Sequence, residues 1–261
     1  MSGKVVAIGS DKGGRCGWLE AAIEQRFIVA SKQEPIVVLI PGLWTPAWVM
    51  LPLAWRLRSR GHRCVTFGYA SARASLEENA ARLARFVRAL GEVPVYLVGH
   101  SLGGVLALHT AAHHGLAQVG RILMAGSPYN DSYAARKLGE RSWGRWMLGR
   151  TVSQWLACEK PMAPEGVDVG VIAGTVGFGL GLIVAPDIGP PHDGVIRVAE
   201  TPVRGMAAYA EVHASHAGIL LSVEVARLVD AFLRSGRFER ASNSATQSAG
   251  TPARVGKRER D

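Results

Sequence analysis

The sequence predicts an α/β fold: a mostly parallel, doubly wound sheet with helices on both faces and a small cap insertion. Short runs of apolar, β-branched residues alternate along the chain with stretches of helical periodicity, and the connections between them are short. Such alternation favours parallel strands joined by right-handed crossovers. With 261 residues, 48% of them apolar and 20% charged, the chain suits one large domain with its own core.

Six runs are the predicted strands. Most are continuously apolar rather than alternating, as expected where both faces of a strand are buried. Ligands in such sheets bind at the carboxyl ends of the strands, so residues that follow a strand are candidates for a functional site. The predicted strands are residues 36–40, 63–67, 93–98, 121–125, 169–173 and 208–212.

The helices between these strands carry start and stop signals. The first has Pro52 in its first turn and Gly61 as its stop. The second begins at Ser75, and Glu78 follows three residues later in the spacing of a capping box. We expect a third helix over residues 102–114.

Between residues 127 and 164 the alternation of strands and helices stops. An insertion after the fourth strand would lie over the carboxyl edge of the sheet, so we expect a cap that walls a pocket with aromatic side chains. Ordinary helix packing with a solvated basic face is the alternative. The apolar residues at about helical spacing in this segment are Trp143, Trp146, Met147, Val152, Trp155 and Leu156.

The third helix opens with the sequence Val-Gly-His-Ser-Leu-Gly-Gly at residues 98–104. A serine between glycines at a strand-to-helix corner is held in a strained turn that exposes its hydroxyl. The Gly-x-Ser-x-Gly pattern alone is a weak signal, but the strand before it and the helix after it favour a nucleophile over an ordinary turn serine. We therefore predict that Ser101 attacks an acyl bond.

A serine hydroxyl is a poor nucleophile near neutral pH, so it needs a base within hydrogen-bond reach and a carboxylate that orients the base. Histidines on the helix after Ser101, or directly beside the serine, are badly placed for this role. The remaining candidate bases lie downstream and are His192, His213 and His216.

The Gly-His-Ser-Leu-Gly-Gly motif in its strand-turn-helix setting resembles the α/β-hydrolase superfamily, in particular small bacterial esterase and lipase-like members, over residues 35–238. The resemblance implies the chain order serine, acid, histidine, with the histidine on a loop before the last helix. It points to His216, because residues 219–232 trace a terminal helix. His213 is the rival, and we expect it to belong to the preceding strand.

The resemblance also implies the acid and the oxyanion donors. Residues 191–196 look like the Asn-Asp-Gly-Thr-Val loop of lipase-like proteins, which makes Asp193 the acid and leaves Asp187 in reserve. One backbone donor is assigned to Leu102 and the other to Leu43 or Trp44. Many relatives have His-Gly where this chain has Pro-Gly at residues 41–42.

These residues predict a serine hydrolase that cleaves carboxylic esters through an acyl-enzyme. The apolar pocket walls favour a small-molecule ester or a lipid as substrate, and no metal or organic cofactor is implied. A thioesterase or an acyltransferase would use the same triad, and a non-catalytic homologue that binds a lipid or a protein is a further alternative. The predicted wall residues are Trp48, Trp143, Trp146 and Phe178.

Two segments are expected to flank the domain: residues 1–34 as an N-terminal extension and residues 239–261 as a disordered basic tail. The chain carries a net charge of +9, and the tail is rich in Ser, Ala, Thr, Gly and Pro. We expect the tail to be solvated, with no specific nucleic-acid partner, since it lacks aromatic side chains for base stacking. A weak contact with an anionic membrane surface is the alternative.

We expect a cytoplasmic protein. No apolar leader region precedes Asp11, and the three cysteines form no Cys-x-x-Cys pair. Residues 169–186 lack charge and approach the length of a membrane span, but five glycines favour a buried strand followed by a loop.

Overall fold

The computed structural model describes residues 33–179 and 181–238. In this part of the chain six strands form one sheet in the order β2-β1-β3-β4-β5-β6, and every neighbouring pair is parallel. The predicted α/β class is confirmed, whereas the predicted tail and nearly all of the N-terminal extension lie outside the described residues. The strands are β1 (Ile36–Ile40), β2 (Arg63–Thr66), β3 (Val95–His100), β4 (Val119–Ala125), β5 (Asp168–Gly174) and β6 (Ala208–Val212).

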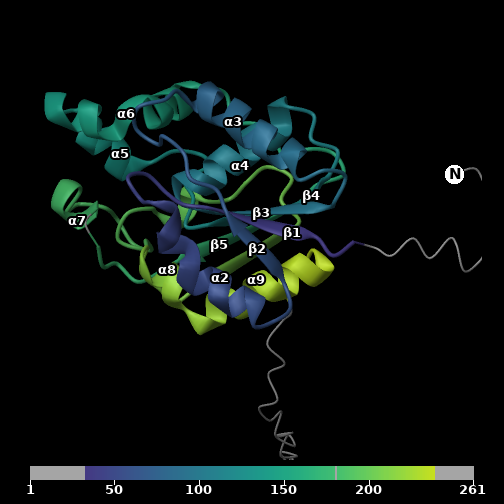
Figure 1. Ribbon diagram of the computed structural model, residues 1–261. Coiled ribbons are helices and arrows are strands. Elements are labelled where there is room, and N and C mark those ends of the chain that lie inside the picture. Colours follow the sequence, from purple (N-terminus) through teal and green to yellow (C-terminus); the bar gives the residue numbers. More distant parts are fainter. Residues whose placement is uncertain (1–32, 180, 239–261) are drawn as a thin grey trace, which may run out of the picture.

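Helices cover both faces of the sheet (Figure 1). One face carries α3 (Leu76–Ala89) and α4 (Leu102–His113), and the other carries α2 (Leu51–Arg58) and α9 (Val223–Ser235). The remaining elements are the short 3-10 helices η1 (Ala47–Met50) and η2 (Val198–Glu200) and the helices α5 (Tyr133–Gly139), α6 (Ser142–Ala157), α7 (Gly181–Val184) and α8 (Gly218–Leu221).

Strand β1 shows why the apolar runs are continuous. Val38 and Ile40 point into the core under α3 and α4, whereas Val37 and Leu39 point into the core under α2 and α9. All four side chains are fully buried. A strand between two helical layers needs an apolar residue at every position, and each such side chain contributes about 1.5–3 kcal/mol of burial free energy.

Several boundaries follow local signals. The capping box of α3 is present: the Ser75 hydroxyl accepts a hydrogen bond from the Glu78 amide, and the Glu78 carboxylate accepts one from the Ser75 amide. The terminal helix predicted over residues 219–232 is two helices, because Ser222 is extended and caps a new helix by accepting from the Val225 amide. The uncharged stretch from residue 169 begins inside β5.

The insertion between β4 and β5 forms α5 and α6, which lie together at one end of the sheet, with α7 nearby (Figure 1). Helix α6 is interrupted at Gly149, whose backbone is non-helical. The Arg150 amide donates a hydrogen bond to the Ala72 carbonyl, 3.0 Å away, and so anchors this interruption to the loop before α3. In the described ranges, no helix combines the length and the apolar character that crossing a bilayer requires.

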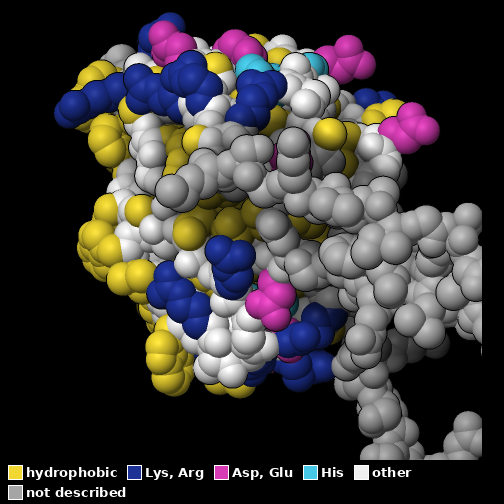
Figure 2. Space-filling view, turned by 45° about the vertical axis from the view of Figure 1, so that its right-hand side comes forward, with side chains coloured by type: hydrophobic (Ala, Val, Ile, Leu, Met, Phe, Trp, Pro, Cys, Tyr) yellow, Lys and Arg dark blue, Asp and Glu magenta, His cyan; other side chains and the backbone are white. Residues whose placement is uncertain are grey.

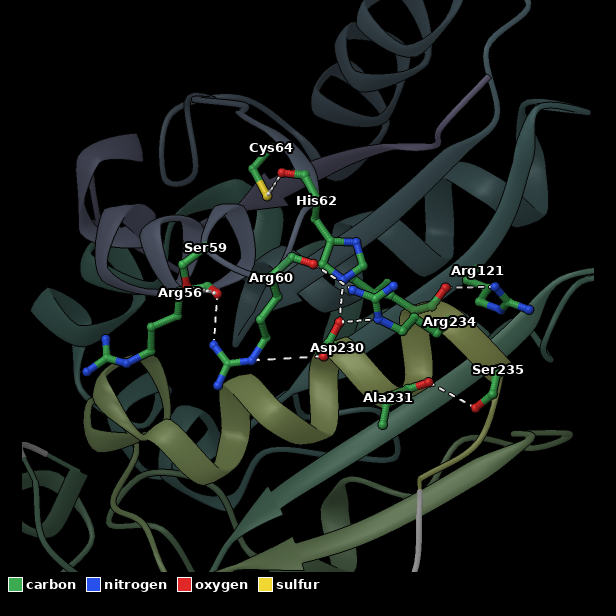
Figure 3. Close-up of polar contacts among 11 residues, drawn as sticks. Arg56, Ser59, Arg60, His62, Cys64, Arg121, Asp230, Ala231, Arg234 and Ser235 are labelled. Atoms are coloured by element: carbon green, nitrogen blue, oxygen red, sulfur yellow. Dashed lines mark hydrogen bonds and ion pairs between the residues drawn. The ribbon is translucent and has the colours of Figure 1, made fainter. Parts of the chain in front are cut away.

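A polar cluster around Asp230 joins α9 to the end of α2 (Figure 3). The Asp230 carboxylate lies 2.7 Å from His62 Nε2 and accepts a hydrogen bond of 2.7 Å from Arg234 Nε, while Arg60 lies 3.9 Å away. Burial alone would raise the pKa of Asp230, but the hydrogen bonds from His62 and Arg234 outweigh burial and hold that pKa below its ordinary value.

Candidate active site

Ser101 lies at the corner between β3 and α4. Its backbone has φ 54° and ψ −125°, a combination that costs strain in a residue with a Cβ atom. The corner is tightly packed: a Cβ atom on Gly99 would lie 2.2 Å from the Gly104 amide, and one on Gly103 would lie 2.2 Å from the Ile40 carbonyl. The glycines of the motif therefore let the chain make this turn.

Ser101 lines a cavity of about 660 Å³ at the carboxyl end of the sheet. His216 and Leu102 also line it, so three of the residues predicted for catalysis meet in one place. The volume is in the range of small-molecule sites. Helices α5 and α6 supply apolar side chains to its wall, among them Leu138, Trp146, Leu148, Val152, Trp155 and Leu156.

Asp193 and His216 form a hydrogen-bonded pair beside this cavity. Asp193 Oδ2 lies 2.7 Å from His216 Nδ1, and the Asp193 side chain is only 1% exposed. The other carboxylate oxygen accepts hydrogen bonds from the amides of Val195, at 2.9 Å, and Ile196, at 2.7 Å. Because both oxygens are bonded, the carboxylate is held in one orientation and its charge is stabilised in the protein interior.

Gly126, directly after β4, gives this pair room. Its φ is +58°, and a Cβ atom there would lie 3.1 Å from Asp193 Oδ2 and 3.4 Å from His216 Nδ1. The sequence interpretation did not include Gly126 in the site. Its position in the sequence could have indicated this role, since Gly126 directly follows a predicted strand at the edge of the sheet where ligands bind.

The other candidates for the acid and the base lie in different surroundings. Asp187, the reserve acid, accepts a hydrogen bond from the Tyr133 hydroxyl, and this bond is the main reason why the pKa of Asp187 is lowered. His213 is exposed and does not line the cavity. His192 Nδ1 accepts a hydrogen bond of 3.1 Å from the Gly194 amide, so it helps to hold the loop that carries Asp193.

His100 reaches the loop of His216, although the sequence suggested that its side chain leaves the corner in another direction. The two imidazole rings lie 4.7 Å apart, and His100 Nε2 donates a hydrogen bond of 2.9 Å to the His216 carbonyl. Burial, and secondarily repulsion from His216, lower the pKa of His100 to about 3. His100 is thus a neutral donor that braces the His216 backbone.

This buried imidazole makes stability depend on pH. The pKa of His100 falls from 6.5 to about 3 on folding, so its contribution to the free energy of unfolding is complete above 6.5 and decreases as the pH falls toward 3. Between about pH 7 and pH 5 we expect the wild type to lose about 2 kcal/mol more of that free energy than His100→Gln. Urea unfolding at both pH values measures the difference, and equal losses would contradict it.

Two residues in the loop after β1, Leu43 and Trp44, were candidates for one oxyanion donor, and their contacts favour one of them. The Trp44 amide donates a hydrogen bond of 3.1 Å to the Ser71 hydroxyl, so this donor is already used. Leu43 and Leu102 both line the cavity, and Leu102 is the first residue of α4, where helical amides lack intrahelical partners. The Leu43 amide is therefore the better candidate in the first loop.

The predicted aromatic walls are only partly in place. Trp146 lines the cavity, whereas Trp48, Trp143 and Phe178 are exposed at the surface and are not among the lining residues. Trp155, another tryptophan of the expected cap, is buried in the wall and donates from its ring nitrogen to the Pro128 carbonyl at 3.0 Å. Within the described residues no group of three or more His, Cys, Asp or Glu could hold a metal ion.

A parallel sheet with a strained serine corner and an Asp–His pair beside one cavity has the architecture of an α/β hydrolase. The sequence pattern of the Alpha/beta hydrolase family matches residues 37–243, and the chain belongs to this family. Family membership supports a hydrolase activity. No curated protein matches the sequence.

Solved structures share the fold at low sequence identity. A metagenomic carboxyl esterase is 17% identical, with a TM-score of 0.53 over 71% of this chain and 65% of the esterase, so the match spans slightly less than two thirds of that protein. A gene product from Listeria innocua is 17% identical, with a TM-score of 0.52 over 80% of this chain and 96% of that one. The pyrethroid hydrolase PytH is 14% identical, with a TM-score of 0.53 over 77% of this chain and 98% of its own.

Proposed function

We propose that the chain is a serine hydrolase that cleaves carboxylic esters through an acyl-enzyme. The observation that carries the proposal is the hydrogen-bonded Asp193–His216 pair at 2.7 Å, with His216 lining the same cavity as the strained Ser101. A carboxylate bonded to Nδ1 leaves Nε2 of the imidazole free to accept a proton, which is what a serine nucleophile requires.

In the proposed reaction His216 Nε2 takes the proton of the Ser101 hydroxyl while Oγ forms a bond to the ester carbonyl carbon. The amides of Leu43 and Leu102 stabilise the negative charge on the carbonyl oxygen. His216 then gives the proton to the leaving alkoxide as the ester C–O bond breaks. Water, deprotonated by His216, then attacks the acyl-enzyme. His216 returns this proton to Ser101 Oγ as the bond between Oγ and the acyl carbon breaks, and the carboxylic acid is released.

The apolar cavity wall supports an ester with a hydrocarbon acyl chain. Each buried methylene group contributes about 0.8 kcal/mol, so kcat/KM for p-nitrophenyl esters should rise about fourfold per added methylene until the cavity is filled. Steady-state rates along the series from acetate to longer chains measure this increase. A decrease from acetate onward would contradict the assignment of the cavity as the acyl site.

The same triad would serve a thioesterase or an acyltransferase. Comparing the turnover of an ester and a thioester that carry the same acyl group tests for a thioesterase. Analysing the products in the presence of an added alcohol tests for an acyltransferase. Faster turnover of the thioester, or a transferred acyl group in place of the free acid, would replace the carboxylesterase assignment.

We also propose a cytoplasmic location, which the cysteines support. Cys64 and Cys158 are free thiols. Burial, partly opposed by the charge of Arg58, raises the pKa of the Cys64 thiol to about 11, so this group is an inert core residue of the kind that persists in a reducing compartment.

A further inference from the structure

Four exposed apolar side chains lie on or beside α6: Trp44, Trp143, Trp146 and Met147, here called the tryptophan patch. The rings of Trp44 and Trp146 lie 6.1 Å apart, and the Trp44 ring nitrogen donates a hydrogen bond of 2.7 Å to the Met147 carbonyl. Trp143 is one helical turn before Trp146 on α6. Trp44, Trp146 and Met147 are exposed and also line the cavity, so the patch borders the cavity where it meets the surface.

Three members of the patch, Trp143, Trp146 and Met147, lie on the outer face of α6, and Trp44 contacts this face from the loop after β1. The opposite face of the helix is buried and includes Leu148, Val152 and Trp155, which pack against the body of the protein and line the cavity. Trp146, in contrast, is 73% exposed and Trp143 is 50% exposed. Large apolar side chains clustered outside the packing face of a helix mark an interaction site rather than a core contact.

Basic side chains accompany the patch. The Arg141 guanidinium lies 5.7 Å from the centre of the Trp143 ring, and Arg145, which directly precedes Trp146 in α6, is exposed. Nearby basic groups have carboxylate partners, as in the pairs Arg136–Asp131, Lys137–Glu140 and Arg150–Glu78. No carboxylate in the described ranges lies within ion-pair distance of Arg141 or Arg145, so these two charges are available to an external anion.

We propose that the tryptophan patch, with Arg141 and Arg145, binds the surface of an anionic phospholipid bilayer. Tryptophan rings favour the boundary between water and hydrocarbon, and nearby arginines are attracted to anionic headgroups. Figure 2 shows hydrophobic side chains gathered along one margin of the molecule, with Lys and Arg side chains beside them. The cavity entrance would then face the lipid.

Charge favours a bilayer over a second copy of this chain as the partner. A symmetric dimer through the patch would bring Arg141 and Arg145 of both copies together, and like charges at a contact are destabilising. The whole chain also carries a net charge of +9. An anionic surface complements both the local and the overall charge.

Binding does not depend on catalysis, but the consequence that ester substrates enter from the bilayer rests on the proposed function. The test is therefore flotation of the full-length Ser101→Ala variant with vesicles of phosphatidylcholine alone or mixed with phosphatidylglycerol. We expect binding to the mixed vesicles and much weaker binding to phosphatidylcholine. Adding Trp143→Ala and Arg145→Glu should reduce binding to the mixed vesicles about tenfold or more.

A matched control makes the same two types of substitution elsewhere. Trp55 on α2 is 68% exposed and Arg85 on α3 is exposed, and neither lines the cavity. The Ser101→Ala protein with Trp55→Ala and Arg85→Glu should bind the mixed vesicles as strongly as Ser101→Ala alone. Equal loss in both sets, no vesicle binding at all, or a dimer that forms through the patch in sedimentation would overturn the proposal.

Two further measurements separate this proposal from the proposed function. Thermal unfolding by circular dichroism confirms that the variants are folded. With Ser101 retained, Trp143→Ala/Arg145→Glu should hydrolyse a dissolved short-chain ester at the wild-type rate, because neither side chain lines the cavity. Loss of vesicle binding with intact hydrolysis supports the membrane surface, whereas absent hydrolysis in the wild type with intact vesicle binding refutes only the hydrolase proposal.

Discussion

Replacing Ser101 with alanine is expected to lower kcat for p-nitrophenyl acetate by about four to six orders of magnitude. The variant removes the only atom that would form the covalent bond, and the residual rate would come from the cavity and the oxyanion donors. The effect on KM should be small, since the apolar wall that binds the acyl group is unchanged. Steady-state kinetics measure both parameters.

Ser153→Ala is a suitable control for Ser101→Ala. Ser153 is an exposed serine of α6 whose hydroxyl donates to the Gly149 carbonyl, and it does not line the cavity. Its substitution should leave turnover unchanged. A Ser101→Ala enzyme that keeps turnover within about tenfold of the wild type would remove Ser101 from the reaction.

Asp193→Asn is the second large effect, with an expected loss of about 10⁴ in kcat. The carboxylate oxygen at 2.7 Å accepts a hydrogen bond from the Nδ1–H group of His216, so the proton stays on Nδ1 and Nε2 is left unprotonated toward the cavity. An amide at this position would present a donor to Nδ1 and favour the opposite tautomer, in which Nε2 carries the proton and cannot act as a base.

Asp187→Asn provides the comparison, because Asp187 is bonded to Tyr133 rather than to a histidine of the site. We expect its turnover of the same ester to stay close to wild type. The reverse ranking of the two variants would transfer the acid role to Asp187.

The sequence allowed most of the fold to be predicted because local signals agree with the tertiary structure. A continuous apolar run such as residues 36–40 is dictated by burial on both faces, and the capping box at Ser75 fixes a helix start locally. The break at Ser222 was missed, since the apolar positions on either side keep a helical period across it. Hydrophobic periodicity indicates which face of a helix is buried, but it does not reveal a single residue whose backbone is extended.

Those parts of the candidate site that depend on three-dimensional packing were harder to predict from the sequence. Resemblance to a loop of lipase-like proteins led to Asp193, whose hydrogen bond to His216 joins residues 23 positions apart in the chain. The outward direction of Trp143 depends on which face of α6 packs against α3 and α5, and aromatic content alone does not encode this. The contact between His100 and the His216 loop arises from strands and loops 116 residues apart.

The central claim is that Ser101 is a nucleophile activated by His216, and reaction with a fluorophosphonate tests it most directly. Mass spectrometry of the labelled protein should locate one adduct on Ser101, with rapid labelling in the wild type and in His213→Ala and almost none in His216→Ala. An adduct on another residue, or equal labelling of wild type and His216→Ala, would contradict the claim.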